Sequence, residues 1–385
     1  MISYGRQTLD KKDIAAVVRV LGSDWLTQGP EVGRFEEAFA AYCGARYAVA
    51  VSSGTAGLHL ACLVAGFDSG SEVITSPLTF VATPNSVLYA GASPKLADID
   101  EKTLGLDPEK IIHGLTPKVR GVMPVYYAGQ PSVWAARKPR VTVIADACHA
   151  LGAEVYVGGR WKRVGGEGLA DMTVFSFHPV KQMTTGEGGM VVTDNPRFYE
   201  ALKKLRSHGI ERSRDRFIDK NQSQNPWYYE MTSLGFNYRL SDIQCALGLS
   251  QLKKINGFLE KRRSIAVFYD RIFKEVPNLQ IPQKIEGTRS SHHLYVLRIN
   301  FKAIGQTRRR LMETLKKKGV GTQVHYIPVY RQLYYRTKNV GCEKDFPVCE
   351  KFYEEALTIP LHAAMTGGDR QKVAREVLAF FRSGR

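Results

Sequence analysis

The feature that most constrains the fold is a series of short apolar segments that alternate with helical segments through the first half of the chain. Short strands separated by helices are typical of a mostly parallel sheet with helices on both faces. Such sheets bind ligands at the carboxyl ends of their strands, so we expect an α/β fold with its site at that edge. Strands are predicted at 48–51, 72–75, 94–97, 118–124 and 141–145, with a helix at 56–65 and a loop followed by a helix within 77–90.

The rest of the chain predicts a second, smaller unit. A helix is expected to begin near Ser241, and one long charged helix, 252–273, is expected to follow it. We therefore predict a large domain over 1–250 and a smaller C-terminal α+β domain over 251–385. In the smaller domain the pattern predicts strands at 294–299 and 323–325, a basic helix at 307–318 and a final helix at 369–381.

Composition limits the class of protein. With 385 residues, 44% of them hydrophobic, the chain can bury a large core. Its net charge of +17 favours anionic ligands, and we prefer a phosphorylated small molecule to nucleic acid because no nucleic-acid-binding motif is present. The six scattered cysteines include no CxxC pair and predict reduced thiols without a metal site. No segment reads as a membrane span or signal peptide, so we expect a cytoplasmic protein without membrane contact.

One lysine lies at the bend of a strand–loop–strand unit. Strands are predicted at 172–177 and 190–193, and the loop between them carries Lys181 and the sequence Gly-Glu-Gly-Gly at 186–189. A lysine that is partly removed from water loses its proton more readily and can attack an aldehyde as a nucleophile. The alternative is a surface hairpin with a solvated lysine, and the loop pattern alone leaves both interpretations open.

A second polar segment follows the strand 48–51. The sequence Ser-Ser-Gly-Thr at 52–55 leads into a predicted helix, where exposed N–H groups and the helix dipole favour a phosphate. Ordinary helix capping is the alternative interpretation. The segment lacks the pattern GxxxxGK[ST], so it is not a nucleotide P-loop.

Together, these strand ends supply what pyridoxal 5′-phosphate (PLP) requires. Its aldehyde needs an amine, its phosphate needs N–H groups and hydroxyls, its ring nitrogen needs a carboxylate, and its ring face suits an aromatic side chain. We therefore predict PLP as the cofactor. The candidate residues are Lys181 for the aldehyde, Gly54, Thr55 and Ser176 for the phosphate, Asp146 for the ring nitrogen, Phe80 for the ring face, and His149 or one of its neighbours for the phenolic oxygen.

The chain resembles the sugar aminotransferases of fold type I, the DegT/DnrJ/EryC1/StrS family, nearly from end to end. The resemblance implies a fold type I PLP-dependent transferase that passes through the pyridoxamine 5′-phosphate form during turnover. It rests on SSGTAGLHL at 52–60, PLTFVAT at 77–83, ADACHALGA at 145–153, FSFHPVKQMTTGEGGMVV at 175–192, RSHGI at 206–210 and GFNYRLSDIQCALGLSQL at 235–252.

The resemblance also implies roles for individual residues. Lys181 would bond to the cofactor and later move a proton, Asp146 would pair with the ring nitrogen, and His149 would approach the phenolic oxygen. Asn237 would complete the phosphate site of a neighbouring subunit, which implies a homodimer with shared active sites. The sugar nucleotide would contact Tyr4, Trp25, Leu26, Thr27, Ser53, His178, Tyr238, His325 and Tyr326.

Within the family, SFHPVK, TTGEGG, LRSHGI, NYRLSD and QVHYIPVY resemble the branch of transaminases of pseudaminic acid synthesis. This implies transfer of the amino group of L-glutamate to C4 of UDP-2-acetamido-2,6-dideoxy-β-L-arabino-hex-4-ulose, giving UDP-4-amino-4,6-dideoxy-N-acetyl-β-L-altrosamine and 2-oxoglutarate. The alternatives are transfer to another nucleotide-linked keto-deoxy sugar, such as a perosamine-type or 3-keto substrate, and a non-catalytic protein that binds a sugar nucleotide. A related dehydratase is disfavoured, because that variant carries a histidine at the position of Lys181.

Two segments depart from the family pattern. Residues 128–141 form a shorter and more basic connection than the family pattern leads us to expect, and residues 211–229 form a long polar insertion that we expect to lie over the active site. Both departures concern sugar specificity and leave the predicted cofactor chemistry unchanged.

Overall fold

The computed structural model of the protein describes residues 1–132 and 141–382. Within these ranges the largest sheet has seven strands in the order β1-β9-β8-β5-β4-β2-β3. All neighbouring strands are parallel except β9, which is antiparallel to both β1 and β8. The predicted α/β fold with a mostly parallel sheet is confirmed. The strands are β1 (Tyr47–Val51), β2 (Glu72–Thr75), β3 (Ser93–Leu96), β4 (Val119–Met123), β5 (Thr142–Asp146), β8 (Met172–Ser176) and β9 (Gly189–Thr193).

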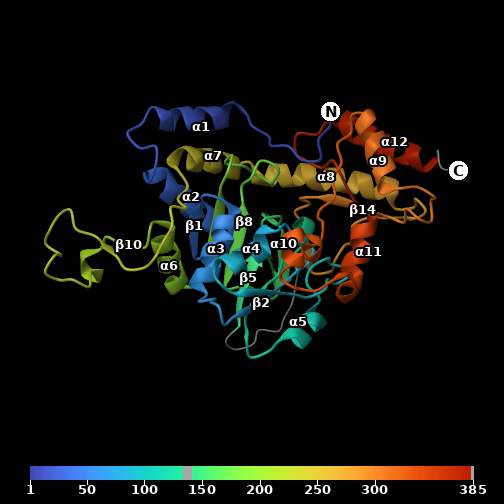
Figure 1. The fold of residues 1–385 in the computed structure, drawn as a ribbon. Coiled ribbons are helices and arrows are strands. Elements are labelled where there is room, and N and C mark those ends of the chain that lie inside the picture. The colour runs from blue at the N-terminus through green and yellow to red at the C-terminus, as the bar shows by residue number, and fades with distance from the viewer. Residues whose placement is uncertain (133–140, 383–385) are drawn as a thin grey trace.

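Helices cover both faces of this sheet (Figure 1). Alternate residues of each strand contribute to different cores: Phe175 and Met190 belong to one, Val174 and Val191 to the other. This alternation follows from the two-residue period of a strand. The first core includes residues of α2 (Pro30–Cys43), α7 (Asp242–Leu252) and α8 (Ile255–Phe273), and the second includes residues of α3 (Gly54–Val64), α4 (Ala82–Tyr89) and α6 (Pro196–Arg206).

The C-terminal part of the chain builds a smaller antiparallel sheet, β12-β14-β15, with a core of its own. Helix α8 contributes to both cores, with Phe258 in the first and Tyr269 in the C-terminal one. The proposed division of the chain after residue 250 stays a prediction. The elements of this part are β12 (Leu279–Gln280), β14 (Tyr295–Ile299), β15 (Ala356–Ile359), α9 (Arg308–Lys317), α10 (Leu333–Arg336), α11 (Pro347–Glu355) and α12 (Gly367–Arg382).

The predicted long charged helix over 252–273 is confirmed as α8, which begins three residues later, at Ile255, after α7 has ended at Leu252. One predicted element differs from the structure. The strand expected at 323–325 is reduced to a single bridge between Gln323 and Thr358. Beyond that bridge the backbone leaves the sheet, and His325 instead hydrogen-bonds the Thr358 hydroxyl through its ring Nδ1 (2.9 Å).

Several short elements complete the fold. A hairpin of β6 (Glu154–Val157) and β7 (Arg160–Arg163) joins β13 (Thr288–Arg289) in a separate sheet. The pair β10 (Ile210–Glu211) and β11 (Glu230–Met231) forms the base of an arm that extends away from the body of the molecule (Figure 1, left). The remaining elements are α1 (Lys11–Leu21), α5 (Pro108–Gly114) and single 3-10 turns at Tyr127–Gly129, Arg214–Arg216, Val329–Arg331 and Glu343–Asp345.

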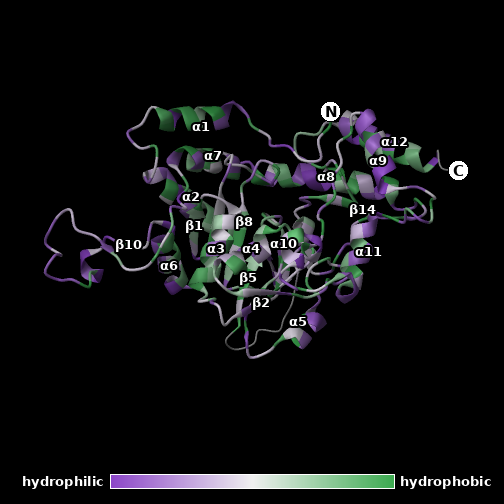
Figure 2. Ribbon diagram, viewed as in Figure 1, coloured by the Kyte–Doolittle hydropathy of each residue, from purple (hydrophilic) through white to green (hydrophobic). Residues whose placement is uncertain are grey.

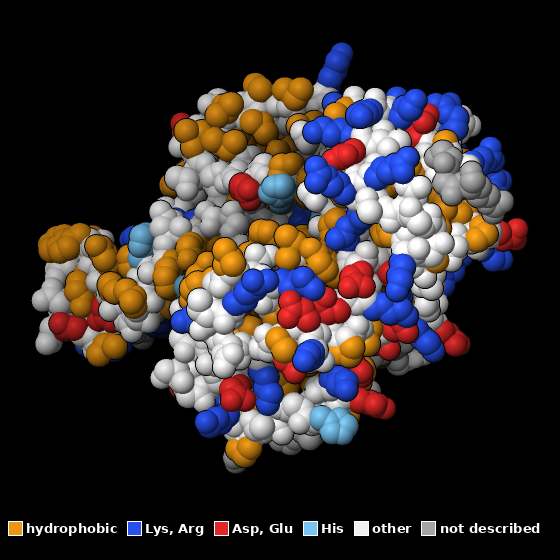
Figure 3. Space-filling view, turned by 45° about the vertical axis from the view of Figure 1, so that its right-hand side comes forward, with side chains coloured by type: hydrophobic (Ala, Val, Ile, Leu, Met, Phe, Trp, Pro, Cys, Tyr) orange, Lys and Arg blue, Asp and Glu red, His pale blue; other side chains and the backbone are white. Residues whose placement is uncertain are grey.

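Helix α1 exposes much of its apolar side. The side chains of Ile14, Val18 and Leu21 are 60%, 59% and 56% exposed. Hydrophobic residues predominate along this helix in Figure 2, and they gather along the upper left edge of the surface in Figure 3. An apolar stripe on a helix normally faces other protein atoms, so this face is available to a partner.

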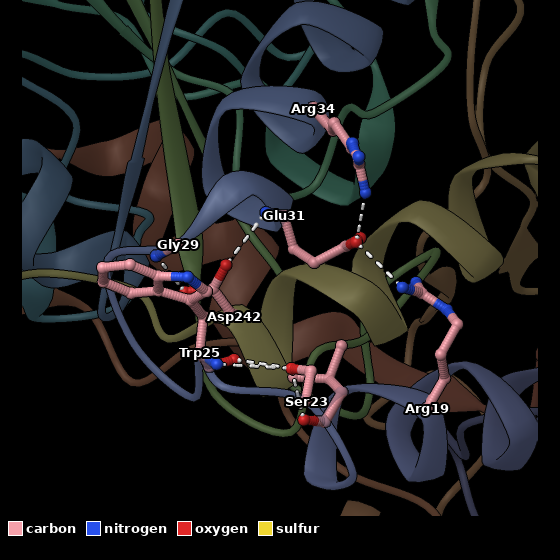
Figure 4. Close-up of polar contacts among 8 residues, drawn as sticks. Arg19, Ser23, Trp25, Gly29, Glu31, Arg34 and Asp242 are labelled. Carbon is pink, nitrogen blue, oxygen red and sulfur yellow. Dashed lines mark hydrogen bonds and ion pairs between the residues drawn. The ribbon is translucent and has the colours of Figure 1, made fainter.

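A buried carboxylate holds the segment between α1 and α2 (Figure 4). The Asp242 side chain accepts hydrogen bonds from the backbone N–H groups of Gly29 (2.6 Å) and Glu31 (2.9 Å). Glu31 in turn forms ion pairs with Arg19 (3.1 Å) and Arg34 (2.7 Å). Asp242 therefore satisfies two N–H groups at the start of α2 and ties residues 25–31 to the N-terminus of α7.

None of the helices in the described ranges combines the length and the apolar character needed to cross a membrane.

Candidate active site

A cavity of about 450 Å³ lies at the carboxyl ends of the parallel strands, where the sequence predicts a site. It is formed by the ends of β5 and β8, the N-terminus of α3, the loop after β2 and residues 325–326. The structure thus brings together most of the predicted site residues. Those that line the cavity are Tyr4, Ser53, Gly54, Thr55, Phe80, Asp146, His149, Ser176, His178, Lys181, His325 and Tyr326.

Lys181 lies in the connection between β8 and β9. Burial lowers the pKa of its amine, while Cys148 and Asp146 partly oppose this shift. The backbone of the residue is fixed on both sides: its N–H donates to the carbonyl of His178 (2.9 Å), and its carbonyl accepts from Arg262 Nη2 (3.2 Å). The loop therefore presents a desolvated amine on a fixed backbone, as a lysine nucleophile requires.

Asp146 is buried at the end of β5 and is oriented by two donors. The Thr83 hydroxyl donates to its Oδ2 (2.6 Å), and the backbone N–H of Cys148 donates to its Oδ1 (3.1 Å). Because the Thr83 hydroxyl proton is used in this way, the Thr83 oxygen accepts from Thr79 (2.7 Å). This chain of hydrogen bonds fixes the carboxylate at the cavity wall.

The N-terminus of α3 forms a second wall. Ser53 caps this helix by accepting a hydrogen bond from the N–H of Ala56 (3.1 Å). The first N–H groups of an α-helix have no partner within the helix, so those of Gly54 and Thr55 can serve a ligand. A Cβ atom on Gly54 would lie only 3.0 Å from Cys148 Sγ and from Ser176 Cβ, which is why the helix can begin this close to β8.

Both ring nitrogens of His149 form hydrogen bonds within the protein. Its Nδ1 accepts from the N–H of Ala128 (3.3 Å), so the ring proton is assigned to Nε2, which lies 3.0 Å from the Tyr326 hydroxyl. Burial, together with nearby Lys181 and His325, holds the pKa of His149 well below its usual range. His149 is therefore neutral at pH 7 and fixed at the cavity wall.

These groups fit PLP. The N-terminus of α3 and the Ser176 hydroxyl suit its phosphate, the buried Asp146 carboxylate suits a protonated ring nitrogen, and the desolvated Lys181 amine suits its aldehyde. Phe80, 57% exposed, lines the same cavity and offers an aromatic face.

Five predicted site residues lie outside this cavity. Tyr238 packs against α3, with its hydroxyl 3.2 Å from Nδ1 of His59 and its ring stacked on Phe236. A single β-bridge joins Thr27 to Ser241, so that residues 25–27 lie next to the segment that follows residues 237–238. The roles proposed for these residues stay predictions. The five are Trp25, Leu26, Thr27, Asn237 and Tyr238.

The two departures from the family pattern have different outcomes. The insertion 211–229 does not cover the cavity of its own chain, because none of its residues lines that cavity and the arm extends outward (Figure 1). Of the connection 128–141, residues 133–140 lie outside the described residues.

Several residues that line or support the site were not among those predicted from the sequence. Thr79 and Thr83 lie in the segment PLTFVAT, and only the fold shows that they orient Asp146. Cys148, Glu187 and His293 also line the cavity. Cys148 could have been identified, since it lies two residues after Asp146 at the same strand end, whereas His293 arrives from a distant segment without a local signal.

Gly54→Ala is expected to weaken PLP binding by about tenfold, because the added methyl group crowds Ser176 and overpacking costs about 1–3 kcal/mol. Titration of the apo-protein with PLP, followed by visible absorption, measures the change. Gly33→Ala is the matched control, since a Cβ there meets no atom within 4 Å. Equal PLP affinity in both variants would contradict the assignment of the α3 N-terminus to the phosphate.

Comparison with known proteins adds independent evidence. The model of the DegT/DnrJ/EryC1/StrS aminotransferase family matches residues 7–378. The spore coat polysaccharide biosynthesis protein SpsC of Bacillus subtilis (strain 168) is 38% identical over 382 residues, which cover 98% of this chain and 96% of SpsC.

Solved structures show the same fold. Helicobacter pylori PseC, described as an aminotransferase involved in the biosynthesis of pseudoaminic acid, has a TM-score of 0.87 and 34% identity, with 99% of each chain covered. Spr1654 from Streptococcus pneumoniae, described as a sugar aminotransferase and solved in its PMP form, has a TM-score of 0.90 and 26% identity, with 100% of each chain covered.

Proposed function

Because the chain belongs to the DegT/DnrJ/EryC1/StrS aminotransferase family, we propose that it aminates C4 of a UDP-linked 4-keto-6-deoxy sugar. The chain is a PLP-dependent sugar aminotransferase of fold type I, as the sequence predicted. The proposed acceptor is UDP-2-acetamido-2,6-dideoxy-β-L-arabino-hex-4-ulose, the donor is L-glutamate, and the product is UDP-4-amino-4,6-dideoxy-N-acetyl-β-L-altrosamine. The observation that carries this choice is the similarity to PseC over 99% of both chains.

The roles of the protein residues follow from their surroundings. When bound, PLP would supply an aldehyde that can carry the amino group and a ring that withdraws electrons from the carbon that loses a proton. Lys181 moves this proton, since its lowered pKa leaves more of the amine neutral near pH 7. Asp146, held by Thr83, would keep a proton on the ring nitrogen, and His149 would hold the phenolic oxygen.

The surface charge is consistent with the proposed substrates. A sugar nucleotide carries a diphosphate, and glutamate and 2-oxoglutarate each carry two carboxylates. The net charge of +17 attracts such anions over distances comparable to the Debye length. Lys and Arg side chains are numerous over the C-terminal helices at the upper right of Figure 3.

We also propose a homodimer with shared active sites. Asn237, Trp25 and Leu26 are exposed and lie outside the cavity of their own chain. The exposed apolar face of α1 offers a surface that a second copy would cover. In such a dimer, Asn237 would complete the phosphate site of the partner.

A second candidate is amination of another nucleotide-linked keto-deoxy sugar. SpsC shares 38% identity with this chain, slightly more than PseC does, and its name refers to spore coat polysaccharide biosynthesis. The cavity residues assigned to PLP serve either acceptor equally, so the choice depends on the sugar-binding surface.

Lys181→Ala and Asp146→Asn test the assigned chemistry. Lys181→Ala should lower the transamination rate by roughly a thousandfold or more, because it removes both the nucleophile and the proton carrier. Asp146→Asn should retain PLP but lower turnover by about a hundredfold, since an amide does not hold the ring nitrogen protonated. Steady-state rates and the visible spectrum give the two readouts, with Lys110→Ala and Asp107→Asn, both remote from the cavity, as controls. Normal turnover in either site variant would rule out the role given to that residue.

The sugar assignment is tested by adding UDP-linked amino sugars to the holoenzyme and recording its visible absorption. The 4-amino-4,6-dideoxy-altrosamine nucleotide should bleach the cofactor band, whereas the gluco epimer should leave it unchanged. Bleaching by a different amino sugar alone would retain the aminotransferase and reject the proposed acceptor. No band after incubation with PLP would contradict the assignment of Lys181.

Mixed dimers test the shared site. If Asn237 serves the partner, a heterodimer of Lys181→Ala and Asn237→Ala chains contains one intact site, and random mixing should restore about a quarter of native activity. Lys181→Ala mixed with Asp146→Asn is the control, because both residues lie in the cavity of one chain and no intact site can form. Activity of the first mixture equal to the sum of its parts would contradict sharing.

A further inference from the structure

A second cavity of about 450 Å³ lies directly behind the active site. It is bounded by α8, by residues 102–104 and by the segment 282–294. The assigned PLP chemistry uses none of the residues of this cavity, and its volume equals that of the active-site cavity.

One layer of backbone separates the two cavities. His292 and Leu294 line the second cavity, while His293 between them lines the active site. On the facing segment Ala128 lines the second cavity, its N–H donates to His149 Nδ1 (3.3 Å), and its carbonyl accepts from the N–H of His293 (3.0 Å). A displacement of this wall would therefore change the hydrogen bonding of a residue at the cofactor.

The wall contains two residues in the left-handed region of backbone space. Ala128 has a φ of 54° and His292 a φ of 48°. Such conformations are uncommon outside glycine, and they concentrate where function requires a defined backbone path. The wall is thus held in a specific shape by its hydrogen bonds to both sides.

The second cavity has an excess of positive charge. Lys102, Arg263, Lys284 and Arg289 line it, and Asp270 is the only acidic residue among its described lining. Asp270 is already bound, because its Oδ1 accepts from the Tyr295 hydroxyl (2.8 Å).

The four cations differ in how far they are neutralised. Arg289 pairs with Glu154 (3.1 Å), and Lys284 lies 3.9 Å from Asp270 with its side chain 87% exposed. Over residues 1–132 and 141–382, neither Lys102 nor Arg263 forms an ion pair. Burial together with Arg263, Arg262 and Lys284 lowers the pKa of His292 to about 4, as expected beside unneutralised cations.

Apolar groups form the rest of the lining, among them Leu104, Ala266, Pro282, Ile285 and Leu294. Cationic side chains around an apolar lining match a molecule with one anionic group and an apolar body. We propose that the second cavity binds such a small phosphate- or carboxylate-bearing molecule and that the Ala128 wall transmits its binding to His149. This site lies beyond the proposed transamination and does not depend on the identity of the sugar.

Titration calorimetry of the PLP-loaded enzyme at constant ionic strength tests the site, with phenyl phosphate, benzoate and inorganic phosphate as probes. Phenyl phosphate or benzoate should bind, and the tighter of the two identifies the preferred anionic group. Arg263→Gln should weaken this binding at least tenfold, Lys102→Gln should also weaken it, and Val267→Trp should block it by filling the cavity. Lys261→Gln, on the same helix but outside the cavity, should bind as the native enzyme does.

If the wall transmits binding to His149, the cofactor absorption band gives a second readout. The aromatic probe should shift the pH midpoint of the cofactor absorption band in the native enzyme and leave that midpoint unchanged in Arg263→Gln. Equal binding by the native enzyme, Arg263→Gln and Val267→Trp, or no binding of either aromatic probe, would overturn the site, and a bound probe without a shift would overturn the coupling. If inorganic phosphate binds as tightly as phenyl phosphate, the proposal that the apolar lining contacts an apolar body of the ligand is wrong. Transamination by Arg263→Gln without a probe should be native, which separates these outcomes from failure of the proposed function.

Discussion

The buried guanidinium of Arg262 joins the parts of the chain on which the active site depends. It donates to the carbonyls of Lys181 (3.2 Å), His293 (3.2 Å) and Leu361 (3.0 Å), which belong to three distant segments. No carboxylate in the described ranges pairs with it, and burial lowers its pKa to about 10. Because a buried cation without its acceptors is strongly unfavourable, these segments are constrained to stay in contact.

Near Arg262, burial shifts the pKa values of two side chains of the active site. The amine of Lys181 and the imidazole of His149 both have lowered pKa values, so the cavity favours their neutral forms. Asp146 keeps its place through Thr83 and the N–H of Cys148. An amine whose pKa is lowered by burial, beside a fixed carboxylate, suits transamination by PLP. The residues of the cavity that are assigned to the cofactor come from a single chain, whereas Asn237, Trp25 and Leu26 are exposed outside it.

The two cavities share their wall, and this links catalysis to the surface of the C-terminal part. His149 contacts the cofactor side of the wall, and its Nδ1 depends on the N–H of Ala128, which belongs to the other side. An anion bound behind this wall would be separated from the active site by a single hydrogen bond, which joins the N–H of Ala128 to His149 Nδ1. The positive charge of the chain would then favour two kinds of anionic ligand, one in each cavity.

The sequence alone determined the order of strands and helices, the strand-end position of Asp146 and the single lysine at the β8–β9 bend, because each depends on local periodicity or on neighbouring residues. It also carried the family resemblance that the comparisons confirm. Only the tertiary structure decided the loss of the strand at 323–325 and the contacts of Asp146 with Thr83 and of His149 with Tyr326. The two contacts join residues 63 and 177 positions apart, and a local pattern contains no information about such pairs.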